Sequence, residues 1–142
     1  MSEKVLLIDD ELDFLEAMSE RMTAQGMEVS TASSADAALK IIETDSFDAI
    51  ILDFQMPGMD GMQALKAIKE KRPESQIILL TGYATVEKGV EAMKVGAADF
   101  IEKPADLEAL AQKIKEAKAQ RMLIVEKQQA KNVLDVLKKY GI

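Results

Sequence analysis

Polar side chains that could do chemistry together follow several short apolar runs of this sequence. In chain order they are Asp9, Asp10, Asp53, Thr81 and Lys103. Three carboxylates held close together repel one another, so such a group needs a cation. Because the chain has no histidine or cysteine, the fitting cation is a hard, oxygen-binding ion such as Mg²⁺. A carboxylate can then act as a nucleophile toward phosphorus, while a lysine and a hydroxyl hold the phosphoryl oxygens.

The composition narrows the possible chemistry further. Without histidine and cysteine, the 142 residues exclude imidazole and thiolate metal sites, histidine-based triads, disulfides and a phosphohistidine. The net charge of -7 argues against non-specific binding of nucleic acid. The N-terminal residues lack the features of a signal peptide, and no apolar stretch approaches the ~20 residues of a membrane span. We therefore expect a soluble, cytoplasmic protein with no membrane contact.

Five apolar runs with the character of strands alternate with five stretches of helical spacing. We expect the strands at residues 4–8, 27–31, 46–52, 76–80 and 99–102. Asp60 and Asp106 are placed to begin the third and fifth helices, and Gly26 and Gly96 to end the first and fourth. Strict alternation predicts an α/β fold, with helices on both faces of a parallel sheet. Ligand chemistry in such folds takes place at the carboxyl ends of the strands, where the polar residues above are expected.

Residues 1–118 complete these five units, and residues 119–142 form a helical C-terminal extension. The extension either continues the fifth helix or forms a sixth one. Its apolar residues recur at helical spacing, namely Ala130, Val133, Leu137 and Tyr140. This stripe packs on its own domain or a partner, forms a dimer, or belongs to a linker toward an output domain. The extension carries a net charge of +3 and residues 1–118 carry -10, and we interpret the basic side as a solvated face.

Four motifs in order resemble the receiver domain of bacterial two-component response regulators, over residues 4–118. They are Leu7-Ile8-Asp9-Asp10, Leu52-Asp53 through Gly61, Leu80-Thr81-Gly82 and Lys103-Pro104. The resemblance implies a flavodoxin-like (βα)5 three-layer sandwich with strand order 2-1-3-4-5. It also implies that Asp53 accepts a phosphoryl group from a histidine kinase or histidine phosphotransfer protein. Phosphorylation would depend on Mg²⁺ and would switch partner binding or oligomerisation.

The resemblance assigns a metal set around the acceptor. Asp10 and Asp53 would ligate Mg²⁺ directly, together with the backbone carbonyl of Gln55. Asp9 would act through a water molecule. Gln55 and Tyr83 would flank the phosphoryl group, at positions that tune dephosphorylation in this family.

The resemblance also assigns a switch. Thr81 would supply the switch hydroxyl, Lys103 would bind the phosphoryl group, and the Lys103–Pro104 peptide would be cis. Phe100 is the expected switch aromatic, although a static core aromatic is the other interpretation. Many receivers have phenylalanine two residues after the lysine, where this chain has Ala105, so the local packing there departs from the family pattern.

Two other functions use the same kinds of residue. One is a phosphate-independent adaptor with a vestigial pocket. The other is a phosphatase with an aspartyl-phosphate intermediate, which needs an aspartate where this chain has Gln55. We expect no enzyme beyond catalysis of the protein's own phosphorylation and dephosphorylation. The expected partners are the phosphodonor and a downstream protein, with no direct contact to nucleic acid. A homodimer would use the C-terminal helix or the face formed by the fourth helix, fifth strand and fifth helix.

Overall fold

Five parallel strands form one sheet in the computed structural model, which describes residues 2–54, 61–82, 86–104 and 106–141. The strands are β1 (Lys4–Ile8), β2 (Glu28–Ala32), β3 (Ala49–Asp53), β4 (Ile77–Thr81) and β5 (Asp99–Glu102). Their order in the sheet is β2-β1-β3-β4-β5, and each neighbouring pair is parallel. The predicted flavodoxin-like strand order is thus confirmed.

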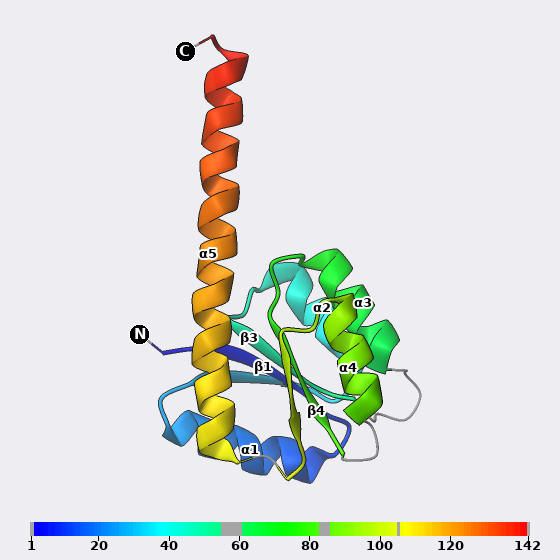
Figure 1. Ribbon diagram of the computed structural model, residues 1–142. Coiled ribbons are helices and arrows are strands. Elements are labelled where there is room, and N and C mark those ends of the chain that lie inside the picture. The colour runs from blue at the N-terminus through cyan, green and yellow to red at the C-terminus, as the bar shows by residue number, and fades with distance from the viewer. Residues whose placement is uncertain (1, 55–60, 83–85, 105, 142) are drawn as a thin grey trace.

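Within the described ranges, five helices cover the two faces of this sheet (Figure 1). They are α1 (Leu12–Ala24), α2 (Ala35–Thr44), α3 (Gly61–Lys71), α4 (Val86–Val95) and α5 (Leu107–Lys139). One hydrophobic cluster joins the sheet to α1 and α5, and a second joins it to α2, α3 and α4. Successive side chains of a strand point to opposite faces, so Leu6 and Ile8 enter one cluster while Val5 and Leu7 enter the other. The molecule is therefore the predicted three-layer sandwich.

The central strands are apolar because helices cover both of their faces. All five residues of β3 and of β4 are buried, including the polar residues that end them. The third strand begins at Ala49, so the prediction that it starts at residue 46 was wrong. Asp48 ends the preceding turn: its backbone N–H donates to the carbonyl of Lys4 at 2.7 Å, and its carboxylate accepts from the Lys4 N–H at 2.7 Å.

The ends of the helices follow the local sequence. Ser34 accepts a hydrogen bond from the N–H of Ala37 at the start of α2, and Asp106 accepts one from Glu108 at the start of α5. Gly26 and Gly96 follow α1 and α4 with positive φ angles of 91° and 122°, which glycine adopts at little cost. The cap predicted at Asp60 lies outside the described residues.

The last helix continues far beyond the sandwich (Figure 1). Leu110, Ile114 and Ala117 are buried against the sheet, but every described residue from position 126 onward is exposed. Of the two alternatives, the extension therefore continues the fifth helix. The interpretation that its apolar stripe packs on its own domain was wrong, because the helix projects away from it. The domain boundary after residue 118 stays a prediction. Within the described part of the chain, no helix has the length and apolarity to cross a membrane.

Candidate functional site

The carboxyl ends of four strands carry the residues singled out from the sequence. Asp9 directly follows β1, Asp53 is the last residue of β3, and Thr81 is the last residue of β4. Lys103 directly follows β5, and its backbone N–H donates to the carbonyl of Thr81 at 2.8 Å. Since parallel strands in register end at the same edge, the fold brings these residues together.

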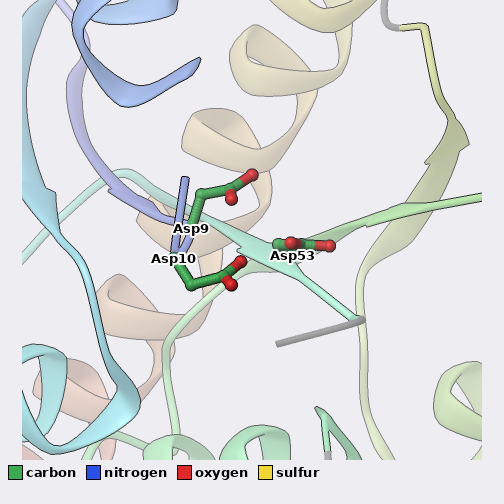
Figure 2. Close-up of side chains that lie close together, drawn as sticks. All are labelled: Asp9, Asp10 and Asp53. Atoms are coloured by element: carbon green, nitrogen blue, oxygen red, sulfur yellow. The ribbon is translucent and has the colours of Figure 1, made fainter. Parts of the chain in front are cut away.

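Three carboxylates form the centre of this site (Figure 2). Asp9, Asp10 and Asp53 each place an oxygen within 4.8 Å of the other two. Asp9 is 0% exposed and Asp53 is 2% exposed, whereas Asp10 lies at the solvent side. The N–H of Glu11 donates to Oδ1 of Asp9 at 2.9 Å, which fixes the orientation of that carboxylate. A compact set of oxygen donors, open on one side, fits a hard divalent cation that keeps part of its water shell.

One lysine supplies positive charge to this acidic group. Nζ of Lys103 lies 3.4 Å from Oδ1 of Asp53 and 3.5 Å from Oδ2 of Asp9. Its ammonium group also lies over the ring of Phe14 in α1, 5.2 Å from the ring centroid. The Lys103–Pro104 peptide bond is cis, as the resemblance implies. The lysine thus reaches the acceptor edge from β5 and is held there by contacts with β1, β3 and α1.

The charges in the site act on one another. Burial raises the pKa of Asp9 above its usual range, and the nearby charge of Asp53 raises it further, while Lys103 and the Glu11 N–H act in the opposite direction. Burial alone would lower the pKa of Lys103, but the carboxylates of Asp53 and Asp9 outweigh it and hold that pKa above the usual range. The lysine is therefore charged at neutral pH, and the site favours additional positive charge.

Thr81 and Phe100 lie on neighbouring strands beside the carboxylates. Thr81 is fully buried, and its hydroxyl donates to the carbonyl of Gly82 at 3.1 Å. Phe100 is half-buried and packs against the cluster beneath α2, α3 and α4. A Cβ added to Gly89 of α4 would lie 3.5 Å from Cγ of Phe100, so the ring rests directly on the backbone of α4. Movement of Phe100 between two positions stays a prediction.

Some residues of the site were missed by sequence reasoning, and others lie outside the described residues. Gln55, predicted as a ligand and flanking residue, Tyr83, predicted to flank the phosphoryl group, and Ala105 belong to the second group. Phe14 was missed because it lies beside the buried stripe of α1. An aromatic residue at that place does not indicate a contact with a lysine that follows β5. Gly61, the first residue of α3, allows close packing. A Cβ at Gly61 would lie 2.5 Å from Cδ1 of the Phe54 ring.

Comparison with known proteins adds independent evidence. A family model described as the response regulator receiver domain matches residues 5–115. The chain is 41% identical over 110 residues to the response regulator protein FleR of Pseudomonas aeruginosa, covering 78% of this chain and 23% of FleR. It is 37% identical over 122 residues to the C4-dicarboxylate transport transcriptional regulatory protein DctD of Rhizobium meliloti, covering 86% of this chain and 26% of DctD. The chain thus spans about a quarter of the length of these curated relatives.

Solved structures agree with the sequence relatives. A response regulator receiver domain protein from Clostridium thermocellum superposes with a TM-score of 0.81 at 35% identity, covering 86% of this chain and 98% of that one. A CheY-like receiver domain protein from Methanospirillum hungatei superposes with a TM-score of 0.79 at 30% identity, covering 86% of this chain and 98% of its own. The likeness therefore extends over the whole of these two receiver chains.

Proposed function

The chain belongs to the response regulator receiver domains of two-component systems, and from this we propose that Asp53 accepts a phosphoryl group. The observation that carries the proposal is the position of this carboxylate. It is buried at the end of a central strand, with Nζ of Lys103 at 3.4 Å and two further carboxylates beside it. A carboxylate placed among a lysine and potential metal ligands is suited to nucleophilic attack on phosphorus.

In the proposed step, an oxygen of Asp53 attacks the phosphorus of a phosphohistidine on a kinase or a histidine phosphotransfer protein. The new oxygen–phosphorus bond forms as the nitrogen–phosphorus bond breaks, and the released imidazole takes up a proton from solvent. Lys103 keeps its positive charge at neutral pH, because its pKa is raised by the carboxylates against the opposing effect of burial. It can therefore hold an oxygen of the arriving phosphoryl group without giving up its proton.

The donor set fits Mg²⁺, which would be held by Asp10 and Asp53 directly and by Asp9 through water. Gln55 would contribute its backbone carbonyl. When bound, the ion supplies charge neutralisation for the phosphoryl oxygens. Without that charge, Asp9 stands against Asp53 in a buried position, so the same carboxylates that bind the ion are unfavourable neighbours when they are alone.

The response to phosphorylation is proposed to run through Thr81 and Phe100. The Thr81 hydroxyl now donates to a backbone carbonyl next to it, and a phosphoryl group on Asp53 offers it a charged acceptor instead. If the hydroxyl moves toward Asp53, it vacates space beside Phe100, whose ring contacts α4 at Gly89. The surface formed by α4, β5 and α5 then changes shape and shifts the binding of a downstream protein.

The chain is proposed to catalyse no reaction beyond its own phosphorylation and dephosphorylation. The burial of Asp9, Asp53 and Thr81 beside the half-buried Lys103 weighs against a vestigial pocket, because such a costly cluster of polar groups has no structural benefit of its own. A phosphatase acting on external phosphoesters would need a further general acid next to the nucleophile.

Intact-mass measurement after incubation with acetyl phosphate and Mg²⁺ tests the proposal. The wild-type protein should gain one phosphoryl group, about 80 Da, and a chelator should prevent the gain. Asp53→Asn removes the nucleophilic oxygen and should stay unmodified. Asp48→Asn is the matched control, since Asp48 lies at the opposite end of β3, and it should react like the wild type. A wild-type protein that stays unmodified with acetyl phosphate and with phosphorylated histidine kinases would overturn the proposal.

A further inference from the structure

The part of α5 that projects beyond the sandwich carries an apolar stripe that is exposed among the described residues. Seven large apolar side chains are exposed on this part of the described chain and its C-cap, among them Leu123 at 53%, Val133 at 58% and the C-cap residue Tyr140 at 69%. A solvent-exposed helix that is only polar needs no partner, but one with this many apolar residues on one side does. We propose that a second copy of this chain covers the stripe, in a parallel two-stranded coiled coil.

The spacing of the stripe matches a coiled-coil seam. Steps of four and three residues alternate without interruption along Ala119, Leu123, Glu126, Ala130, Val133, Leu137 and Tyr140. This is the a/d repeat of a heptad, with Leu123, Ala130 and Leu137 at one seam position and the others at the second. The residues on the outer side of the helix are mostly charged or amide side chains: Arg121, Gln128, Lys131, Asn132, Asp135, Lys138 and Lys139. The seam thus begins where α5 leaves the sandwich and continues to its end.

The stripe faces away from the sandwich, which leaves room for a second copy. Ile114 is buried against the sheet, and Ala130 follows it by sixteen residues, which rotates the side chain by roughly 160° around the helix axis. Two copies can therefore join their extensions while their sandwiches lie on the outer sides. Arg121, whose Nη1 lies 4.0 Å from Oδ1 of Asp48, places a positive charge of the extension beside the sandwich.

Charge favours the parallel orientation over the antiparallel one. Glu126 occupies the second seam position. In a parallel coiled coil, a residue at this position lies beside the residue that follows the same position in the facing helix. Glu126 of each copy therefore meets Lys127 of the other. An antiparallel pair centred on the same seam would place Glu126 against Leu137 instead. The two reciprocal ion pairs compensate the one acidic residue in the seam and fix the register.

The contact is of the size that a dissociable dimer needs. Apolar side chains of this kind each remove on the order of 60–120 Å² from water when they are buried. Four of the seven exposed apolar side chains lie in the seam, and Met122, Leu134 and Val136 flank it at neighbouring positions. Seven per copy therefore bring the two-copy contact to roughly 1,000 Å², near the lower limit of specific interfaces. Ala130 and Glu126 weaken two layers of the seam. The expected state is thus a monomer–dimer equilibrium that depends on concentration.

Sedimentation equilibrium over a wide range of concentrations tests whether the chain forms a dimer through this stripe. The mass should rise from 15.6 kDa toward twice that value as the concentration increases. Val133→Lys puts a charge into the seam and should raise the dissociation constant at least tenfold. Asn132→Lys is the matched control, because it adds the same residue and the same charge at the neighbouring outer position, and it should change the constant less than twofold. A monomer at every concentration, or equal effects of the two variants, would overturn the proposal.

The natural absence of cysteine permits a direct test of orientation. Leu123→Cys should give a disulfide-linked dimer on mild oxidation, because residues at one seam position face each other in a parallel pair. Antiparallel pairing about this seam would separate the two sulfurs by roughly 25 Å, which excludes a bond. Gln128→Cys, on the outer side, should stay unlinked. Failure of Leu123→Cys to cross-link faster than Gln128→Cys would refute the parallel arrangement. The proposal does not depend on phosphorylation of Asp53, so either can fail alone.

Discussion

Nζ of Lys103 lies 3.4 Å from Oδ1 of Asp53, although β3 and β5 are separated by β4 in the sheet. The lysine reaches across the end of β4 and also contacts Asp9, so one cation serves carboxylates from two further strands. The acceptor site is therefore held together by charge as well as by backbone pairing. The free energy of unfolding should therefore change when a charged residue of this site is replaced by a neutral one.

Replacement of Lys103 by methionine should destabilise the metal-free protein. The change keeps much of the apolar stem but leaves Asp9 and Asp53 without their cation, and we expect a loss of about 1–2 kcal/mol in the free energy of unfolding. Added Mg²⁺ should restore part of this loss. Urea denaturation with and without Mg²⁺ measures both effects. Lys94→Met, on the exposed side of α4, is the control and should change little. Equal unfolding midpoints of the wild type and Lys103→Met would contradict this role of the lysine.

Replacement of Asp9 by asparagine should stabilise the metal-free protein. Burial and the charge of Asp53 raise the pKa of Asp9 above its usual range, so the folded state binds its proton more tightly than the unfolded state does. Between the usual pKa and the raised one, the wild type therefore loses stability as the pH rises. Asparagine carries no charge to bury, so its advantage should grow through this pH window and then stay constant.

Thermal unfolding in a chelator, at a series of pH values, measures the difference between Asp9→Asn and the wild type. The variant should also gain less stability from Mg²⁺ than the wild type does. A difference that shrinks as the pH rises would be the opposite of what the raised pKa requires. Asp36→Asn in α2 serves as the control, because it removes a carboxylate without touching the site.

Two glycines at helical positions should respond in opposite ways to alanine. A Cβ at Gly61 would lie 2.5 Å from the Phe54 ring and 2.8 Å from the Phe54 carbonyl oxygen, so Gly61→Ala forces a shift and should cost about 1–3 kcal/mol. A Cβ at Gly89 would lie at an ordinary distance of 3.5 Å from Phe100, and alanine is the better helix former there. Gly89→Ala should therefore leave stability unchanged or raise it by up to about 1 kcal/mol. Chemical denaturation of the two variants compares them directly, and a larger loss in Gly89→Ala would refute the contacts described.

A tryptophan at position 100 should report the proposed switch. The chain contains no tryptophan, so Phe100→Trp gives a single tryptophan whose emission can be excited selectively over that of the two tyrosines. Its emission should change when the protein is treated with acetyl phosphate and Mg²⁺. Adding Thr81→Ala should abolish that change while intact mass still shows phosphorylation, and Thr81→Ser should restore it. If the fluorescence response were unaltered in the Thr81→Ala background, the change at position 100 would not depend on Thr81.

The sequence was informative where residue type and strand position act together. The ends of four strands carried a distinctive polar residue, and Asp53 and Thr81 stand out because they end runs of buried aliphatic residues. Strict alternation of strands and helices then determined that these ends meet. The start of β3 was less predictable, because Phe47 is buried like a strand residue although it lies in the loop between α2 and β3.

Contacts between distant segments could not be predicted in the same way. Nothing local to Phe14 indicates that Lys103 will lie over its ring, and nothing local to Gly61 indicates that Phe54 will approach it. The sequence also did not determine whether the C-terminal part of α5 packs on the sandwich. Periodicity shows an apolar stripe at Val133 and Leu137, but it does not distinguish a stripe packed on the same chain from one that projects into solvent.

Mapping the phosphorylated residue tests the central claim most directly. After treatment with acetyl phosphate and Mg²⁺, borohydride reduces an acyl phosphate to an alcohol, which converts the modified aspartate to homoserine. Peptide mass spectrometry then locates that homoserine along the chain. The account predicts homoserine at position 53, with Asp9 and Asp10 unchanged in the same sample. Homoserine at position 9 or 10, with Asp53 intact, would contradict the assignment of Asp53 as the acceptor.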